Sequence, residues 1–267
     1  MTNLSTADSS TLTDAAAGPP LSVRRIGLGD LKDALAKGYD DFMAAPTQLV
    51  FLGLIYPIVG LLAARAASGG TLLPLLYPLV AGLSLMGPLA AIGIYELSRR
   101  REQGLPVSWV NAFDVRHSRS FFSILLLGLL LLTIFVIWLA SAKAIYDGTV
   151  GPVAFTSIGA FLSHVFSTPE GWNLIIFGNA IGFIFAVLVL TLTVVSFPLL
   201  LDRNVGALVA VQTSVRAVLK NPFAMAVWGL IVALALLIGC LPVFVGLAVV
   251  MPILGHATWH LYRKVVT

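Results

Sequence analysis

The sequence is poor in charged residues and in cysteine. Asp, Glu, Lys and Arg make up only 10% of the 267 residues, while 58% are apolar. Soluble domains carry roughly 25% charged residues, so a soluble fold of this length could not cover its surface. Cys240 has no second cysteine to pair with, which excludes an intramolecular disulfide. The low charge predicts that the lipid bilayer surrounds most of the chain.

Motifs of known reaction chemistry are also lacking. The patterns GxxxxGK[ST], GxSxG and CxxC do not occur, so P-loop nucleotide hydrolysis, serine acyl transfer and thioredoxin chemistry have no support. Residues 1–20 lack the basic start and apolar core of a signal peptide. We expect a disordered tail at 1–22, a single membrane domain at 23–267, and no enzymatic activity.

Six apolar stretches approach the ~20 residues that a helix needs to cross the ~30 Å hydrocarbon core. They lie near 47–66, 72–97, 120–142, 172–201, 222–239 and 241–262. The last two are joined by a very short turn, so 222–262 is either two full spans, which its length favours, or a re-entrant pair. The predicted fold is an all-α integral membrane protein with six transmembrane helices.

The basic residues are distributed unequally between the two sides of these spans. Fourteen of the 16 Lys and Arg residues fall before span one, between spans two and three, between four and five, or after six. Only Arg65 and Lys143 fall on the other side. Basic connections stay in the cytoplasm, so we expect both termini to be cytoplasmic. The net charge of +4 therefore reflects membrane orientation and does not indicate nucleic-acid binding.

A repeated pattern of an amphipathic segment, a span, a turn and a second span with an internal proline covers about 28–97, 106–201 and 203–262. Pro88, Pro198 and Pro252 occupy matching places in the three copies. Repetition of this kind indicates internal symmetry, here threefold. Proline kinks transmembrane helices, so the three positions either form a gate or only shape the bundle.

Each copy begins with a segment in which apolar and charged residues alternate with helical spacing. In the first, Leu31, Leu35, Tyr39 and Phe42 are expected on the apolar face and Asp41 among the polar residues. Similar segments occupy 106–119 and 208–220. Helices of this type lie in the headgroup plane. We expect them to brace the ends of the spans, and the alternative is that they dock a partner.

Alignment of the repeats on their prolines brings four polar residues to corresponding depths, namely Glu96, Asp202, His256 and His260. The two histidines share one helical face because they are four residues apart. With two carboxylates they would suit zinc or iron, or a proton relay. The alternative is structural ion pairing, such as Glu96 with Arg99 or Arg100. No cofactor is the leading expectation, with a metal or haem as the alternative.

The fourth span contains Gly178, Asn179 and Gly182 in a GxxxG pattern. Small residues at this spacing let helices approach closely, and an amide side chain can hydrogen-bond to a neighbouring helix. We expect these three residues to serve helix packing.

Val23–Ile26, the first amphipathic segment and the closing stretch Pro252–Arg263 resemble an uncharacterised bacterial family of inner-membrane proteins with a domain of unknown function. Some members carry the label cytochrome c oxidase subunit I. The resemblance covers about 23–265 and implies a location in the inner membrane without assigning an activity. A haem-copper oxidase subunit needs more spans and more histidine ligands than the four His residues of this chain.

These observations support three hypotheses. The first is a structural, accessory or assembly protein that acts through helix packing and its cytoplasmic interfacial helices, with other inner-membrane proteins as partners. The second is a small transporter or channel along the pseudo-threefold axis. The third is a metal- or haem-binding membrane protein that uses His256 and His260.

Overall fold

The computed structural model describes residues 21–267 except 47–48, 50–52, 68–69, 154 and 156. In this part of the chain there are twelve α-helices, two 3₁₀-helices and one isolated β-bridge, which confirms the all-α prediction. The α-helices are α2 (Leu28–Ala44), α4 (Ile55–Ala67), α5 (Leu76–Leu85), α6 (Gly87–Ala90), α7 (Ile92–Glu102), α8 (Phe121–Thr149), α9 (Ile158–Ser167), α10 (Pro169–Thr193), α11 (Ser196–Asp202), α12 (Ala207–Lys220), α13 (Pro222–Cys240) and α14 (Leu247–Val265), and the 3₁₀-helices are η1 (Gly70–Leu75) and η2 (Trp109–His117).

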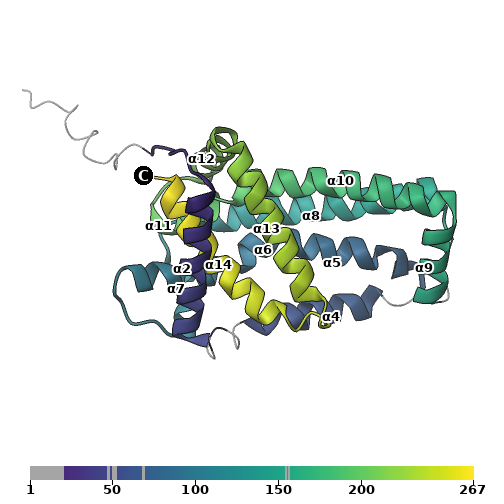
Figure 1. Cartoon of the computed structure of the whole chain (residues 1–267), viewed down its shortest axis with the longest axis horizontal. Helices are drawn as coiled ribbons and strands as arrows, with labels where there is room; N and C mark the ends of the chain where they lie inside the picture. The colour runs from purple at the N-terminus through teal and green to yellow at the C-terminus, as the bar shows by residue number, and fades with distance from the viewer. Residues whose placement is uncertain (1–20, 47–48, 50–52, 68–69, 154, 156) are drawn as a thin grey trace, which may run out of the picture.

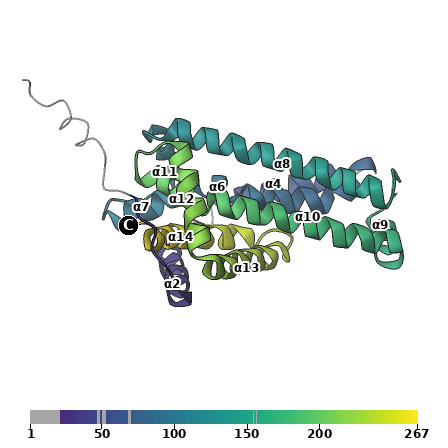
Figure 2. The ribbon, with the colours of Figure 1, turned by 90° about the horizontal axis from the view of Figure 1, so that it is seen from above.

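The helices α8 and α10 lie side by side along the long axis of the molecule, and α9 connects them at one end (Figures 1 and 2). Three stretches are long and apolar enough to cross a membrane: Phe121–Thr149, Pro169–Asp202 and Pro222–Cys240. They correspond to the predicted spans 120–142, 172–201 and 222–239. The connection between the first two of these stretches contains the short helix α9.

The other three predicted spans have a different form. Residues 72–97 are divided among η1, α5, α6 and α7, and 241–262 consists of a turn followed by α14. Part of 47–66 is α4, while 47–48 and 50–52 lie outside the described residues. Membrane crossings at 47–66, 72–97 and 241–262 therefore remain predictions, and so does the threefold repeat.

The apolar helices leave much of their surface uncovered. Only 22% of the apolar window of Pro222–Cys240 is buried inside the molecule, against 56% for Pro169–Asp202. Outward-facing side chains such as Phe183, Phe223 and Leu237 are all more than half exposed. Contiguous apolar surface of this kind marks contact with a membrane or another protein.

A second group of helices gathers at the end of the bundle opposite α9. It comprises α2, α7, α11, α12 and the C-terminal half of α14 (Figures 1 and 2). Among the described elements, α2 and α14 pack together most extensively. Their backbones meet at Gly38, where an added Cβ would lie only 2.5 Å from the Ala257 backbone nitrogen. Glycine is required here because no side chain fits between the two helices.

The segment before α2 is held by residues far along the chain. Val23 and Val266 form the β-bridge, and Ser22 exchanges backbone hydrogen bonds with Thr267. The Asn221 amide accepts from the Ile26 N–H at 2.8 Å and donates to the Arg24 carbonyl at 3.0 Å. Asn221 directly precedes α13, but its side chain makes no capping bond to that helix. It fixes the N-terminal segment instead.

Candidate functional site

A buried polar cluster lies where α2, α7 and α14 meet. We define the Asp41 cluster as Asp41 of α2, Ser98 and Arg101 of α7, and His256 and His260 of α14. One carboxylate oxygen, Asp41 Oδ2, accepts from the Ser98 hydroxyl at 3.1 Å and contacts His260 Nε2 at 2.8 Å. The other, Oδ1, pairs with Arg101 Nε at 3.0 Å. The carboxylate therefore joins all three helices.

We assign the tautomer of His256 from its hydrogen-bond partners. Ser98 Oγ lies 2.5 Å from His256 Nδ1. The serine has one hydroxyl hydrogen, and it is donated to Asp41, so Ser98 accepts and His256 Nδ1 carries the proton. The neutral imidazole then has an unprotonated Nε2 with a lone pair. This atom is buried and has no hydrogen-bond partner among the described residues.

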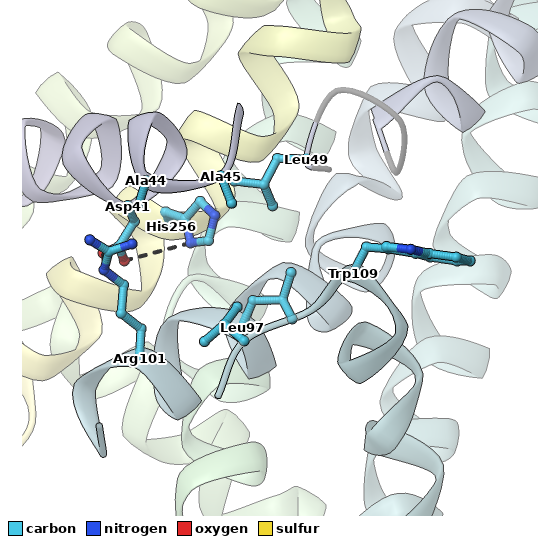
Figure 3. A pocket seen from close by; sticks show the side chains of 9 residues that line it. Asp41, Ala44, Ala45, Leu49, Leu97, Arg101, Trp109 and His256 are labelled. Atoms are coloured by element: carbon cyan, nitrogen blue, oxygen red, sulfur yellow. Dashed lines mark ion pairs between the residues drawn. The ribbon is translucent and has the colours of Figure 1, made fainter. Parts of the chain in front are cut away.

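A cavity of about 120 Å³ lies beside this nitrogen. In Figure 3 the ring nitrogen of His256 that is not joined to Asp41 lies on the side of Ala45 and Leu49. The remaining side chains that line the cavity are mostly apolar, and they come from α2 and the residues that follow it, from α7, and from the start of η2 and the segment before it. The lining residues are Asp41, Ala44, Ala45, Leu49, Leu97, Arg101, Val107, Trp109 and His256.

The Asp41 carboxyl is ionised in this setting. Burial opposes its ionisation, but the hydrogen bond from His260, the nearby His256 and the Ser98 hydroxyl together hold its pKa below the ordinary value of 3.8. Hydrogen bonds to a carboxylate stabilise its charged form. The cluster therefore contains a carboxylate, a guanidinium and a neutral imidazole at neutral pH.

Glu96 and Asp202 lie at the same end of the molecule as the histidines but belong to other interactions. Glu96 pairs with Arg99 at 2.7 Å, as the ion-pairing alternative predicts. Asp202 accepts from the Tyr262 hydroxyl at 2.6 Å and from Arg263 at 3.2 Å. Within the described part of the chain, no group of three or more His, Cys, Asp or Glu residues is arranged to hold a metal ion. The metal site formed by Glu96, Asp202, His256 and His260 stays a prediction.

The two carboxylates instead line a second, more open cavity of about 500 Å³ between α7, η2 and α11. Its walls include Arg99, Arg100 and Arg203. Arg100 pairs with Asp114 at 3.2 Å, and Arg203 lies 3.9 Å from Asp202. The charges in this cavity are therefore largely balanced by one another.

The three prolines occupy different settings. Pro88 lies in the short α6 between α5 and α7, and Pro198 lies in α11, just after the end of α10. Pro252 lies inside the continuous helix α14. Two of the three positions therefore lie beside helix interruptions, and a gate at the three prolines stays a prediction.

The three residues of the GxxxG pattern have unequal surroundings. A Cβ at Gly182 would lie 3.1 Å from the Trp138 ring, whereas a Cβ at Gly178 would meet nothing within 4 Å. The side-chain amide oxygen of Asn179 accepts a hydrogen bond from the Tyr77 hydroxyl of α5 at 3.0 Å. Gly182 and Asn179 thus contact neighbouring helices, while Gly178 faces open space.

Sequence reasoning missed Asp41 as a site residue and placed it on the polar face of its helix. This prediction was wrong, because Asp41 is 8% exposed and Tyr39, expected on the apolar face, is 52% exposed. The small residues Ala34 and Gly38 could have indicated which face of this helix is buried. Leu31, Ala34, Gly38 and Asp41 follow the three- and four-residue steps of one helical face, and all four are buried.

Part of the chain is similar to a family of known sequences. Residues 76–202, somewhat less than half of the chain, match the family described as "Predicted integral membrane protein (DUF2189)". No curated protein and no solved structure matches the sequence. The match supports an integral membrane protein of unknown function whose several apolar helices suggest a multi-pass arrangement.

Proposed function

We propose that this protein is a structural, accessory or assembly component of the bacterial inner membrane. It acts through helix packing and through the helices at its basic end, and its partner is another integral membrane protein. One observation carries the proposal: these helices present apolar side chains outward. On α12, Leu208 and Leu219 are 70% and 72% exposed, and Val110 and Phe113 of η2 are each 53% exposed.

The inward face of α12 explains why large apolar residues of this helix lie at the surface. The residues of α12 that pack against the rest of the molecule are small or hydroxylated: Ala210, Thr213, Ser214 and Ala217. The bulky Leu208 and Leu219 lie outside this contact at the surface, while Val211 and Val218 are partly buried against the core. The same helix thus serves internal packing with one face and offers an apolar face to lipid headgroups or a protein.

The proposed topology has six crossings with both ends in the cytoplasm. Three long apolar helices and the shorter apolar helix Leu73–Leu85 support several crossings. Fourteen of the 16 basic residues fall on the side assigned to the cytoplasm. Helices α2, α7 and α12, which carry seven of these basic residues, lie opposite α9 in Figure 1.

The test is affinity purification of the tagged full-length chain from native membranes in mild detergent. We expect a stoichiometric membrane-protein partner that is lost in Leu219→Glu but kept in Gln212→Glu, a matched change at an exposed polar position of the same helix. Recovery of the chain alone, or a partner insensitive to Leu219→Glu, would reject the accessory role. Metal and haem analysis of the same sample tests the alternative site at His256 and His260.

A further inference from the structure

We infer that the cavity beside His256 is a binding site for a small uncharged molecule with one N–H or O–H donor and an otherwise apolar body. The donor would bind His256 Nε2, and the body would lie against the apolar wall of the cavity. This inference is independent of the accessory role, because it concerns the interior contact of α2, α7 and α14 and not their outer surface.

The unprotonated Nε2 is the feature that requires a ligand. His256 is 2% exposed, so bulk water does not reach the ring. A buried acceptor without a partner is costly, and nearly all buried polar atoms in proteins are hydrogen-bonded. Because Ser98 already receives the Nδ1 proton, the ring cannot turn its other nitrogen to solvent without losing that bond. A molecule that donates to Nε2 satisfies the ring in its present orientation.

The charges around the cavity favour a neutral occupant. Asp41 and Arg101 pair at 3.0 Å, so their charges offset one another. The buried imidazole carries no charge in the tautomer described above. An ion entering this space would lose its hydration without gaining a free counter-charge, which is strongly unfavourable. A cation would also meet Arg101, and an anion would meet Asp41.

The volume and the lining of the cavity limit the size and the polarity of the rest of the ligand. A cavity of about 120 Å³ is slightly smaller than the engineered cavity of ~150 Å³ that binds benzene. Apart from the polar groups, the lining includes Leu49, Leu97, Val107 and Trp109. We therefore expect a single ring, or a chain of comparable size, with one donor at its edge.

Pyrrole and furan are suitable probes because they have nearly the same shape and only pyrrole carries an N–H. Binding to the full-length protein in nanodiscs is measured by saturation-transfer NMR. We expect pyrrole to bind about tenfold more tightly than furan, since furan leaves the buried acceptor unpaired. Equal binding of the two probes, or no binding of pyrrole above that of empty nanodiscs, would overturn the inference and leave the cavity to water alone.

One variant and one control test whether His256 causes the preference for pyrrole over furan. The change His256→Phe keeps a ring and removes Nε2, so the preference for pyrrole over furan should disappear. The matched control is His164→Phe, because His164 Nε2 in α9 is also buried without a hydrogen-bond partner among the described residues. This control should keep the full preference. A preference that survives His256→Phe would contradict the assignment.

Ser98 acts as a positioning residue, because it holds the proton on Nδ1. We expect Ser98→Ala to reduce the preference for pyrrole, and Ser98→Thr, which keeps the hydroxyl, to restore it. If His256→Phe does not fold, ¹⁵N NMR of histidine-labelled wild-type protein replaces it. Pyrrole should then shift the unprotonated Nε2 resonance of His256, and an unchanged resonance would reject the site.

Discussion

At the scale of single residues, the tightest constraint is the backbone contact between α2 and α14. Gly38 lies against Ala257 so closely that an added methyl group would overlap the main chain of α14. Backbone atoms cannot turn aside as a flexible side chain can. Any substitution at this position must therefore move one of the two helices.

The change Gly38→Ala should lower the free energy of unfolding by about 1–3 kcal/mol, the usual cost of overpacking. The measurement is the thermal unfolding midpoint in detergent. Gly29→Ala, in the first turn of the same helix, is the control, because a Cβ there would meet nothing within 4 Å. The prediction fails if both variants unfold at the temperature of the wild type.

Single residues also show where sequence reasoning reached its limit. The ion pair of Glu96 with Arg99 follows from a three-residue spacing and could be predicted. The hydrogen bonds of Asp41 could not, because Ser98, His256 and His260 lie on other helices, and the approach of α2 to α14 depends on the contact of Gly38 with Ala257. Alignment on the prolines placed Asp202 at the correct end of the molecule, but it could not show that Tyr262 and Arg263 would take its carboxylate.

At the scale of elements, hydroxyl groups of neighbouring helices compensate for interrupted backbone. Between α10 and α11, the Ser214 hydroxyl of α12 donates to the Thr191 carbonyl at 2.8 Å and accepts from the Val195 N–H at 3.3 Å. Both backbone groups lie where the regular helix is broken. One side chain from another helix thus replaces bonds that a continuous helix would make internally.

Ser214→Ala should destabilise the protein by about 1–3 kcal/mol, because it leaves buried backbone groups unpaired. The urea dependence of unfolding followed by tryptophan fluorescence measures this loss. Ser141→Ala removes a hydroxyl that bonds only within its own exposed helix at 2.8 Å, and it should be nearly neutral. Equal effects of the two substitutions would show that Ser214 does not support the helix break.

The helix α2 carries three carboxyl groups whose pKa values are lowered by α14 and by the segments around it. A backbone hydrogen bond from Gly27, with Arg24 and Lys264 nearby, lowers the pKa of Asp30. A hydrogen bond from Lys264 lowers the pKa of Asp33. The pKa of Asp41 is lowered as described above. Each group stabilises the docked helix when ionised, so this contribution is present above the unfolded pKa of ~3.9 and is lost as pH falls through the lower folded values.

We therefore expect α2 to detach from α14 in acid. Hydrogen–deuterium exchange, corrected for its intrinsic pH dependence, should show α2 amides protected at pH 7 and 5 and progressively less protected as pH falls below ~3.9. The helix α9 carries no carboxylate and serves as the internal reference. Protection of α2 that is unchanged at pH 3 would contradict this assignment.

At the scale of the whole molecule, the distribution of charge predicts the orientation. A green fluorescent protein fused after Thr267 should fluoresce, and alkaline phosphatase inserted between α8 and α9 should be active, because the basic end is expected in the cytoplasm. A fusion after Thr267 that does not fluoresce, together with an inactive phosphatase between α8 and α9, would show the opposite orientation. A phosphatase insertion between α13 and α14 also tests whether 222–262 forms two crossings.

The helical class and three long apolar helices could be predicted because each depends on a local pattern of hydrophobicity. The breaks at Gly87 and Val195 could not, since a broken helix and a continuous one have the same apolar composition. The buried side of α12 was also unpredictable. Its Thr213 and Ser214 read as polar in the sequence, and only the packing against α10 and α11 makes them interior.

The contact between α2 and α14 also has a consequence for biosynthesis. Asp41 and His260 are 219 positions apart, so α2 emerges from the ribosome long before its partner exists. At 5–20 residues per second this interval is roughly 10–45 s. During that time Leu31, Phe42 and an unpaired carboxylate are without their final neighbours. Nascent chains should therefore be most vulnerable to proteases and most dependent on chaperones before translation ends.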